Sequence, residues 1–252
     1  MIYLLLVLYL LCAGLFAAPV GNPTLPALLE EGFIIPDTYW SNPQCGFSFD
    51  YLIQKRIRCC HSSKSLGLRK GFISGSSEMG TLVWSIRERF NIQLELGSGQ
   101  YSWGWQQKGR NVLGRSSGGI LWGGDAKLII LGIKDTTFAI DAQAGGWDWM
   151  SGSSTSNGFA SGDHVNSLLR YWQLGAALTQ KIAFFAPYLG FAVNRTRLKV
   201  WHLPTGTGRF HARHQIRPFG GCSISSGNRF LANIEWRGWF EEGLSLSAQI
   251  RF

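Results

Sequence analysis

The last nine residues, 244–252, constrain the fold more than any other stretch of the chain. Polar and apolar side chains alternate there without a break, and the apolar positions are Leu244, Leu246, Ala248, Ile250 and Phe252. This period of two predicts a β-strand with one apolar face. At roughly 3.3 Å per residue and a tilt of about 40°, nine residues nearly cross the roughly 25 Å apolar band of a transmembrane barrel. An edge strand of a soluble sandwich would show the same alternation, so the rest of the chain must decide.

Composition favours a membrane barrel over a soluble domain. Charged residues make up 15% of the chain, against roughly 25% in an average soluble domain. The chain has 32 Gly, 11 Trp and 16 Phe, which suit turns and the aromatic belts at membrane interfaces. Beyond the N-terminus there is no apolar run of about 20 residues, so a multi-span helical protein is not expected.

The N-terminal region predicts export. Residues 1–17 are almost wholly apolar and end in small residues, which is typical of a cleaved signal peptide, with cleavage near Ala17 or Ala18. They contain no Lys or Arg, so an uncleaved anchor is the alternative. Residues 18–44 contain closely spaced prolines and are interpreted as an irregular periplasmic lead. The barrel is expected over residues 45–252.

The remaining alternation predicts strands whose apolar side chains face lipid and whose polar side chains face the lumen. Roughly 18 residues per strand and connection give about eleven strands, and since bacterial barrels favour even numbers we expect twelve, with ten as the fallback. The C-terminal strand closes the barrel and ends in Phe252. We expect loops where this pattern fails, at residues 66–79, 145–164 and 194–217. Seven tryptophans are expected to serve in an interface girdle or as packing residues: Trp84, Trp103, Trp105, Trp122, Trp172, Trp236 and Trp239.

The chain carries 24 Lys and Arg against 15 Asp and Glu, a formal charge of +9, which favours anionic partners such as phosphates, lipopolysaccharide or anionic solutes. Nucleic acid is not expected, because no RNP-like motif, finger spacing or basic helix occurs. The densest positive charge lies in the predicted loop 194–217. It is interpreted as an electropositive loop or lumen wall that attracts anions or binds lipid phosphates, or else as a solvated loop without a ligand. The candidates are Arg195, Arg197, Lys199, Arg209 and Arg213.

Charged residues on the predicted inner face are candidates for lining a pore. Facing charges across a lumen would set its ion preference, and the positive balance favours small anionic solutes. The alternative is a lumen plugged by salt bridges. The candidates are Asp50, Arg56, Arg58, Arg87, Glu95, Arg229, Glu235 and Arg237.

The mature chain keeps four cysteines as disulfide candidates: Cys45, Cys59, Cys60 and Cys222. Export makes disulfides possible, and adjacent cysteines do not easily bridge to each other. No spacing fits zinc, His211 and His214 are expected to be surface groups, and no metal or cofactor is expected.

Two other functions have weaker signals. Asp163, His164, Asn166 and Ser167 supply the residue types of a hydrolase close together in sequence, but a triad requires geometry that sequence proximity does not provide. We therefore expect no enzyme activity. An adhesin or envelope structural protein would bind partners through loops that expose Trp147, Trp149 and Trp201.

Four short motifs resemble the chlamydial major outer membrane protein and its porin relatives. They are Pro19-Val-Gly-Asn-Pro23, Gly46-Phe-Ser-Phe-Asp50, Ala186-Pro-Tyr-Leu-Gly190 and Gln249-Ile-Arg-Phe252. The resemblance implies a β-barrel of the bacterial outer membrane with diffusion-porin activity and disulfide links to other envelope proteins or to a second copy. The chain is shorter than the family pattern and has fewer cysteines.

The closing strand also resembles the insertion signal of bacterial outer-membrane proteins, with Leu244, Leu246, Ile250 and Phe252 as the signal residues. This resemblance implies the barrel-assembly machinery as a partner, together with outer-membrane lipid and lipopolysaccharide.

Overall fold

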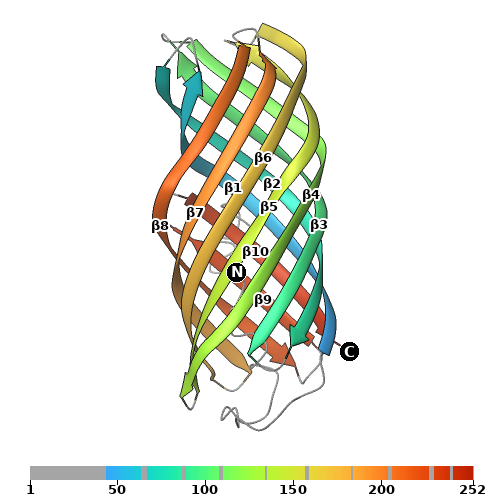
Figure 1. The fold of residues 1–252 in the computed structure, drawn as a ribbon, viewed down its shortest axis with the longest axis vertical. Helices are drawn as coiled ribbons and strands as arrows, with labels where there is room; N and C mark the ends of the chain where they lie inside the picture. Colours follow the sequence, from blue (N-terminus) through green and yellow to red (C-terminus); the bar gives the residue numbers. More distant parts are fainter. Residues whose placement is uncertain are drawn as a thin grey trace, which may run out of the picture.

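Ten antiparallel strands follow one another along the chain, and pairing of the first with the last closes them into a barrel (Figure 1). The computed structural model describes residues 44–63, 67–86, 89–107, 110–133, 135–156, 159–182, 184–203, 206–226, 230–238 and 241–251, although not every side chain within these ranges. The strands are β1 (Gln44–Ser63), β2 (Gly67–Ile86), β3 (Phe90–Gln107), β4 (Arg110–Ile133), β5 (Thr136–Ser156), β6 (Phe159–Gln180), β7 (Phe185–Leu203), β8 (Gly206–Ser226), β9 (Phe230–Arg237) and β10 (Glu241–Arg251). Among these residues, no helix is long and apolar enough to span a membrane.

The predicted all-β transmembrane antiparallel barrel is confirmed, with the fallback number of ten strands in place of twelve. The expected count was too high because β1 to β8 are 18 to 24 residues long. Each of these strands continues well beyond the length needed to cross an apolar band. The predicted signal peptide and the Pro-rich lead, up to residue 43, lie outside the described residues.

The two rims of the barrel differ, and we call them the chain-end rim, where β1 begins and β10 ends, and the far rim. In the half next to the chain-end rim, apolar side chains point outward. Leu94, Leu174 and Leu189 are 54 to 64% exposed. Their chain neighbours Gln93 and Gln173 are buried inside. This outward apolar surface, called the membrane band below, follows the predicted alternation.

In the half next to the far rim, the alternation is reversed. Trp103, Leu198 and Phe210 point into the barrel and are no more than 1% exposed, whereas Arg197 and Arg209 are exposed outside. The loops predicted at residues 66–79, 145–164 and 194–217 were therefore wrong, because these stretches form parts of β2, β5 to β6 and β7 to β8. Their outer face is polar, so a search for lipid-facing apolar residues did not recognise them as strands.

The barrel narrows toward the far rim. β9 and β10 have only 8 and 11 residues, and Figure 1 shows them confined to the lower part of the barrel. Beyond them β1 pairs directly with β8, with Cys60 opposite His211 and His61 opposite Phe210. The far half is therefore a ring of eight strands, a size at which side chains fill the interior.

A β-bulge on β4 marks the border between the two halves. Gly118 has a φ of +76° and falls at the register shift between Gly99 and Gln100 of β3. On either side of it, the outward residue changes from apolar Ile120 to charged Arg115. A glycine accepts this backbone conformation without a Cβ penalty, and a bulge bends and twists the strand that contains it.

Candidate functional site in the barrel lumen

The lumen of the chain-end half is lined by polar and charged side chains. The strands present them inward because their alternate residues form the membrane band. The charged members among the described residues are Asp50, Glu95, Asp125, Lys127, Asp141, Arg217, Glu235 and Arg237, and all except half-buried Asp50 are buried.

Hydrogen bonds cross this polar lumen between strands that are not neighbours. Arg237 on β9 donates from Nε to Glu235 at 2.8 Å and from Nη1 to Gln173 on β6 at 3.1 Å. The Tyr188 hydroxyl on β7 donates to Glu235 at 3.1 Å. β6 and β9 are separated by two strands, so the Arg237 side chain reaches across the interior. Buried charges are stabilised in this way by pairing and hydrogen bonding.

A second group lies on the opposite wall. Glu95 accepts a hydrogen bond from Gln143 at 2.8 Å and one from the Tyr171 hydroxyl at 3.4 Å. The Lys127 Nζ atom lies 3.3 Å from Oδ2 of Asp125. Lys127 is also the register partner of Asp141 on β5. The two hydrogen bonds to Glu95 connect β3 with β5 and β6, whereas the Lys127–Asp125 salt bridge lies within β4.

Asp141 is a buried carboxylate on β5 that faces the lumen. Neither of its carboxylate oxygens has a hydrogen-bond partner among the described residues. A polar position of this kind is suited to holding a bound water. No three His, Cys, Asp or Glu side chains in the described part of the chain come together in a way that could hold a metal ion.

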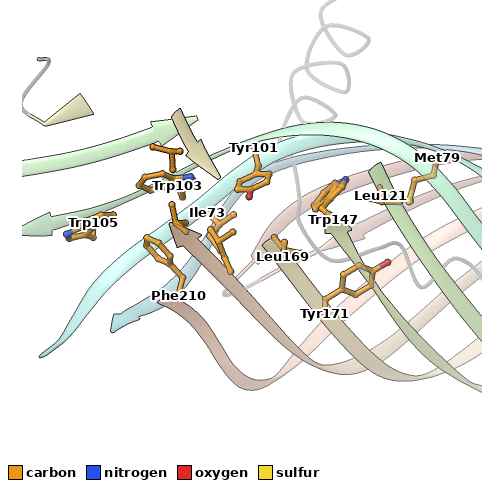
Figure 2. Packing of buried hydrophobic residues seen from close by; sticks show 13 residues of the cluster. Ile73, Met79, Tyr101, Trp103, Trp105, Leu121, Trp147, Leu169, Tyr171 and Phe210 are labelled. Atoms are coloured by element: carbon orange, nitrogen blue, oxygen red, sulfur yellow. The ribbon is translucent and has the colours of Figure 1, made fainter. Parts of the chain in front are cut away.

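Aromatic and aliphatic side chains, which we call the aromatic plug, fill the lumen of the far half and the adjoining border with the chain-end half. Trp103 and Trp105 on β3 stack with ring centroids 5.7 Å apart, and Phe210 on β8 lies 5.8 and 5.5 Å from them. Figure 2 shows the labelled side chains gathered inside the barrel. The described plug residues are Ile73, Met79, Tyr101, Trp103, Trp105, Leu121, Trp147, Val165, Leu169, Tyr171, Leu198, Val200 and Phe210.

Below this aromatic layer, a second contact bridges the lumen. Tyr101 and Trp147 stack at 6.0 Å from β3 and β5. Ser116 on β4 and Ser167 on β6 share a hydrogen bond of 2.8 Å. In both pairs the side chains pass over the strand that separates them. Trp147 therefore packs in the interior, not in the exposed loop expected for an adhesin.

Four of the predicted pore-lining residues lie inside the barrel: Asp50, Glu95, Glu235 and Arg237. The side chains of the other four, Arg56, Arg58, Arg87 and Arg229, lie outside the described residues. The prediction missed Asp125, Lys127, Asp141 and Arg217. Asp125 and Lys127 alternate with outward Leu128, so the same period of two could have identified them. Arg217 was missed because it lies in the stretch that was predicted to be a basic loop.

The anion-binding candidates do not form a loop. Arg195, Arg197 and Lys199 lie on β7 and Arg209 lies on β8, all on the outer face of the barrel. The alternate residues of β7 enter the aromatic plug, so the chain stays extended here. Arg213 also lies on β8, but its side chain is outside the described residues.

The remaining candidates are scattered. Leu246 and Ile250 of the insertion signal face outward, Leu244 is only 6% exposed beside its register partner Trp236, and Phe252 is not described.

Cys45 and Cys222 are free, and the side chains of Cys59 and Cys60 are not described.

Two of the four hydrolase candidates point in opposite directions. Ser167 faces the lumen and Asn166 faces outside, so these two do not share a site. The side chains of Asp163 and His164 are not described.

The tryptophans predicted for the girdle lie in different places in the two halves of the barrel. Trp84, Trp122 and Trp236 are 42 to 52% exposed and border the membrane band, and Trp172, on the same outer face, is 36% exposed. Trp103 and Trp105 are buried in the plug instead, and Trp239 lies outside the described residues.

A closed antiparallel barrel with an outward apolar band and a polar inner wall defines a membrane-spanning β-barrel. No family model and no curated protein matches the sequence. Among solved structures, the chain is similar to the outer membrane protease OmpT from Escherichia coli, at 8% identity over 88% of this chain and 95% of that one, with a TM-score of 0.48.

Two further solved structures are similar over most of their length. The translocator domain of the autotransporter NalP from Neisseria meningitidis shares 14% identity over 86% of this chain and 90% of that domain, with a TM-score of 0.28. A mutant of the monoaromatic hydrocarbon channel TodX shares 9% identity over 94% and 92%, with a TM-score of 0.33. These low identities and scores give no ground for transferring an activity to this chain.

Proposed function

We propose that this protein is a bacterial outer-membrane β-barrel that is closed to solutes and serves as a structural protein of the envelope. The observation that carries the proposal is the contact of Trp103 and Trp105 with Phe210 across the eight-stranded half. Interiors packed by large side chains leave few voids larger than a water molecule. A solute that entered from the chain-end rim would meet this layer before reaching the far rim.

The proposed location rests on the membrane band and on the polar extension beyond it. Closed barrels satisfy every backbone hydrogen bond and can therefore cross lipid. In bacterial barrels the short turns lie in the periplasm and the larger extensions lie outside the cell. The far half, whose outer face carries Arg115, Arg197 and Arg209, is accordingly assigned to the cell exterior.

A porin-like channel for small solutes is the second candidate, favoured by the polar lumen of the chain-end half. The described charged residues there comprise five carboxylates (Asp50, Glu95, Asp125, Asp141 and Glu235) and three cations (Lys127, Arg217 and Arg237). A lumen with this balance would favour cations. The anion preference expected from the overall charge of the chain has no support in these residues.

Proteoliposome swelling separates the two candidates. The refolded protein is reconstituted into vesicles, which are diluted into isotonic solutions of sugars of increasing size. A closed barrel gives the swelling rate of protein-free vesicles for every sugar. Swelling that is fast for the smallest sugar and falls with sugar size would reject the structural role in favour of a porin.

We also propose that the chain is a short, divergent member of the chlamydial major outer membrane protein family. Three of the resembling motifs fall on β1, β7 and β10. The disulfide-linked envelope that the resemblance implies finds support in Cys45, which is free and exposed. In envelopes prepared without reductant, the protein should migrate in high-mass species that collapse when reductant is added and are diminished by Cys45→Ser.

A further inference from the structure

The outer surface changes abruptly from apolar to cationic across β6, β7 and β8. Leu174, Val193 and Ile216 are paired in one row, and Leu174 and Ile216 are 54% and 67% exposed. The next outward residues toward the far rim on β6 and β7 are Trp172 and Arg195, which are paired with each other. Two residues of a strand span only about 7 Å, so the change from apolar to charged occurs at the upper edge of the membrane band.

Above that edge the positive charges stand side by side. Arg197 lies between Arg170 on β6 and His211 on β8, and in the next row Lys199 lies between Leu168 and Arg209. Like charges directly opposite each other on a sheet destabilise it. Their concentration on one side of the barrel, directly above the membrane band, therefore requires an explanation beyond folding.

Among the described side chains, few of these charges are neutralised by a carboxylate. Arg170 is paired with Asp148 and lies over the ring of Trp122. Lys199 lies over the ring of Trp201, with its Nζ atom 4.5 Å from the ring centroid. Among the side chains that the structure describes, no carboxylate is in salt-bridge range of Arg195, Arg197 or Arg209. We call Arg195, Arg197, Lys199 and Arg209 the basic patch.

We propose that the basic patch binds the phosphate groups of a phosphorylated glycolipid in the outer leaflet, with its acyl chains lying on the row formed by Leu174, Val193 and Ile216. Such a lipid carries its phosphates on a sugar headgroup directly above its acyl chains, which matches the order of the rows. Guanidinium groups bind phosphate oxygens in a bidentate manner. Trp172 lies at the level where aromatic side chains meet headgroups.

The bound lipid is assigned as a glycolipid because of the length of the basic patch along the strand. Arg195 and Lys199 are four residues apart on β7, so the patch extends about 13 Å along the strand. A single phospholipid phosphate would contact one row, whereas two phosphates on a disaccharide can contact two rows at once. Free phosphate would satisfy the charges but would not use the apolar row below.

The test measures binding of bis-phosphorylated lipid A to the full-length refolded barrel in detergent. The triple variant Arg195→Gln/Arg197→Gln/Lys199→Gln removes three charges of the patch. The variant Arg89→Gln/Arg115→Gln/Lys181→Gln removes the same number of charges outside it and serves as the matched control. Heat-modifiable gel mobility checks that each variant is folded.

The patch variant should bind lipid A roughly 100-fold more weakly than the control, because each basic group near an anionic surface contributes on the order of a fivefold change in affinity. Equal weakening by both variants would reduce the effect to net charge and overturn the site. Equal affinity of the wild-type protein for dephosphorylated lipid A would overturn phosphate recognition. Binding of phosphatidylglycerol as tight as that of lipid A would overturn the assignment to a glycolipid. None of these outcomes depends on whether the lumen is closed.

Discussion

The rings of Trp103 on β3 and Phe210 on β8 lie 5.8 Å apart, centroid to centroid, although their strands are separated by β2 and β1 even where the barrel has eight strands. This contact is possible because β9 and β10 end early and let β1 meet β8. The short final hairpin therefore both narrows the far half and brings the aromatic side chains together. The proposed closure of the lumen rests on this change in strand number.

Removing Trp103 should destabilise the barrel far more than removing a lipid-facing tryptophan. Trp103→Ala leaves a cavity in the plug and should lower the free energy of unfolding by about 3–5 kcal/mol. Trp84→Ala, at a position that is 47% exposed on the outer face, is the control and should cost much less. Urea titration of the refolded protein in lipid vesicles provides the measurement. Equal losses would mean that the plug is not tightly packed.

Breaking the buried pair of Glu235 and Arg237 should also be costly. Glu235→Gln removes the carboxylate that pairs with the buried Arg237 guanidinium, and the loss should be about 3–5 kcal/mol. The double variant Glu235→Gln/Arg237→Gln should lose less than the sum of the two single variants, because no uncompensated charge remains. Additive losses in the same urea titration would show that the two side chains do not interact.

The bulge at Gly118 predicts a purely conformational effect. Gly118→Ala places a Cβ in open space but at a positive φ, so it should cost roughly 1–2 kcal/mol. Gly132, on the same strand, also has nothing within 4 Å of an added Cβ, but it has an ordinary φ. Gly132→Ala should be close to neutral, and a similar loss in both variants would contradict a strained backbone at Gly118.

The membrane-embedded half was predictable from the sequence. Leu94 and Leu96 face lipid and the intervening Glu95 faces the lumen, as the period of two predicts. Glu235 and Arg237 were placed on the inner face from the same alternation. In this half, one physical rule fixes which side of each strand is apolar.

The far half was not predictable by the same rule, because its interior is apolar and its exterior is wet. Leu198 and Val200 point inward there, so the intervening Arg197 and Lys199 had to point outward. The alternation of residues 195–200 is as regular as that of the closing strand, but its sense is reversed. Recognising the reversal requires knowing where the membrane ends and that the final hairpin is short, and neither is encoded locally in that stretch.

The central claim is that the aromatic plug closes the lumen, and planar-bilayer recording tests it most directly. Wild-type protein inserted into a bilayer should give no conductance steps, whereas Trp103→Ala/Phe210→Ala should give discrete steps once the plug is opened. Gel mobility before and after heating confirms that both proteins are folded barrels. Regular conductance steps from the wild-type protein, equal in size to those of the double variant, would contradict the claim.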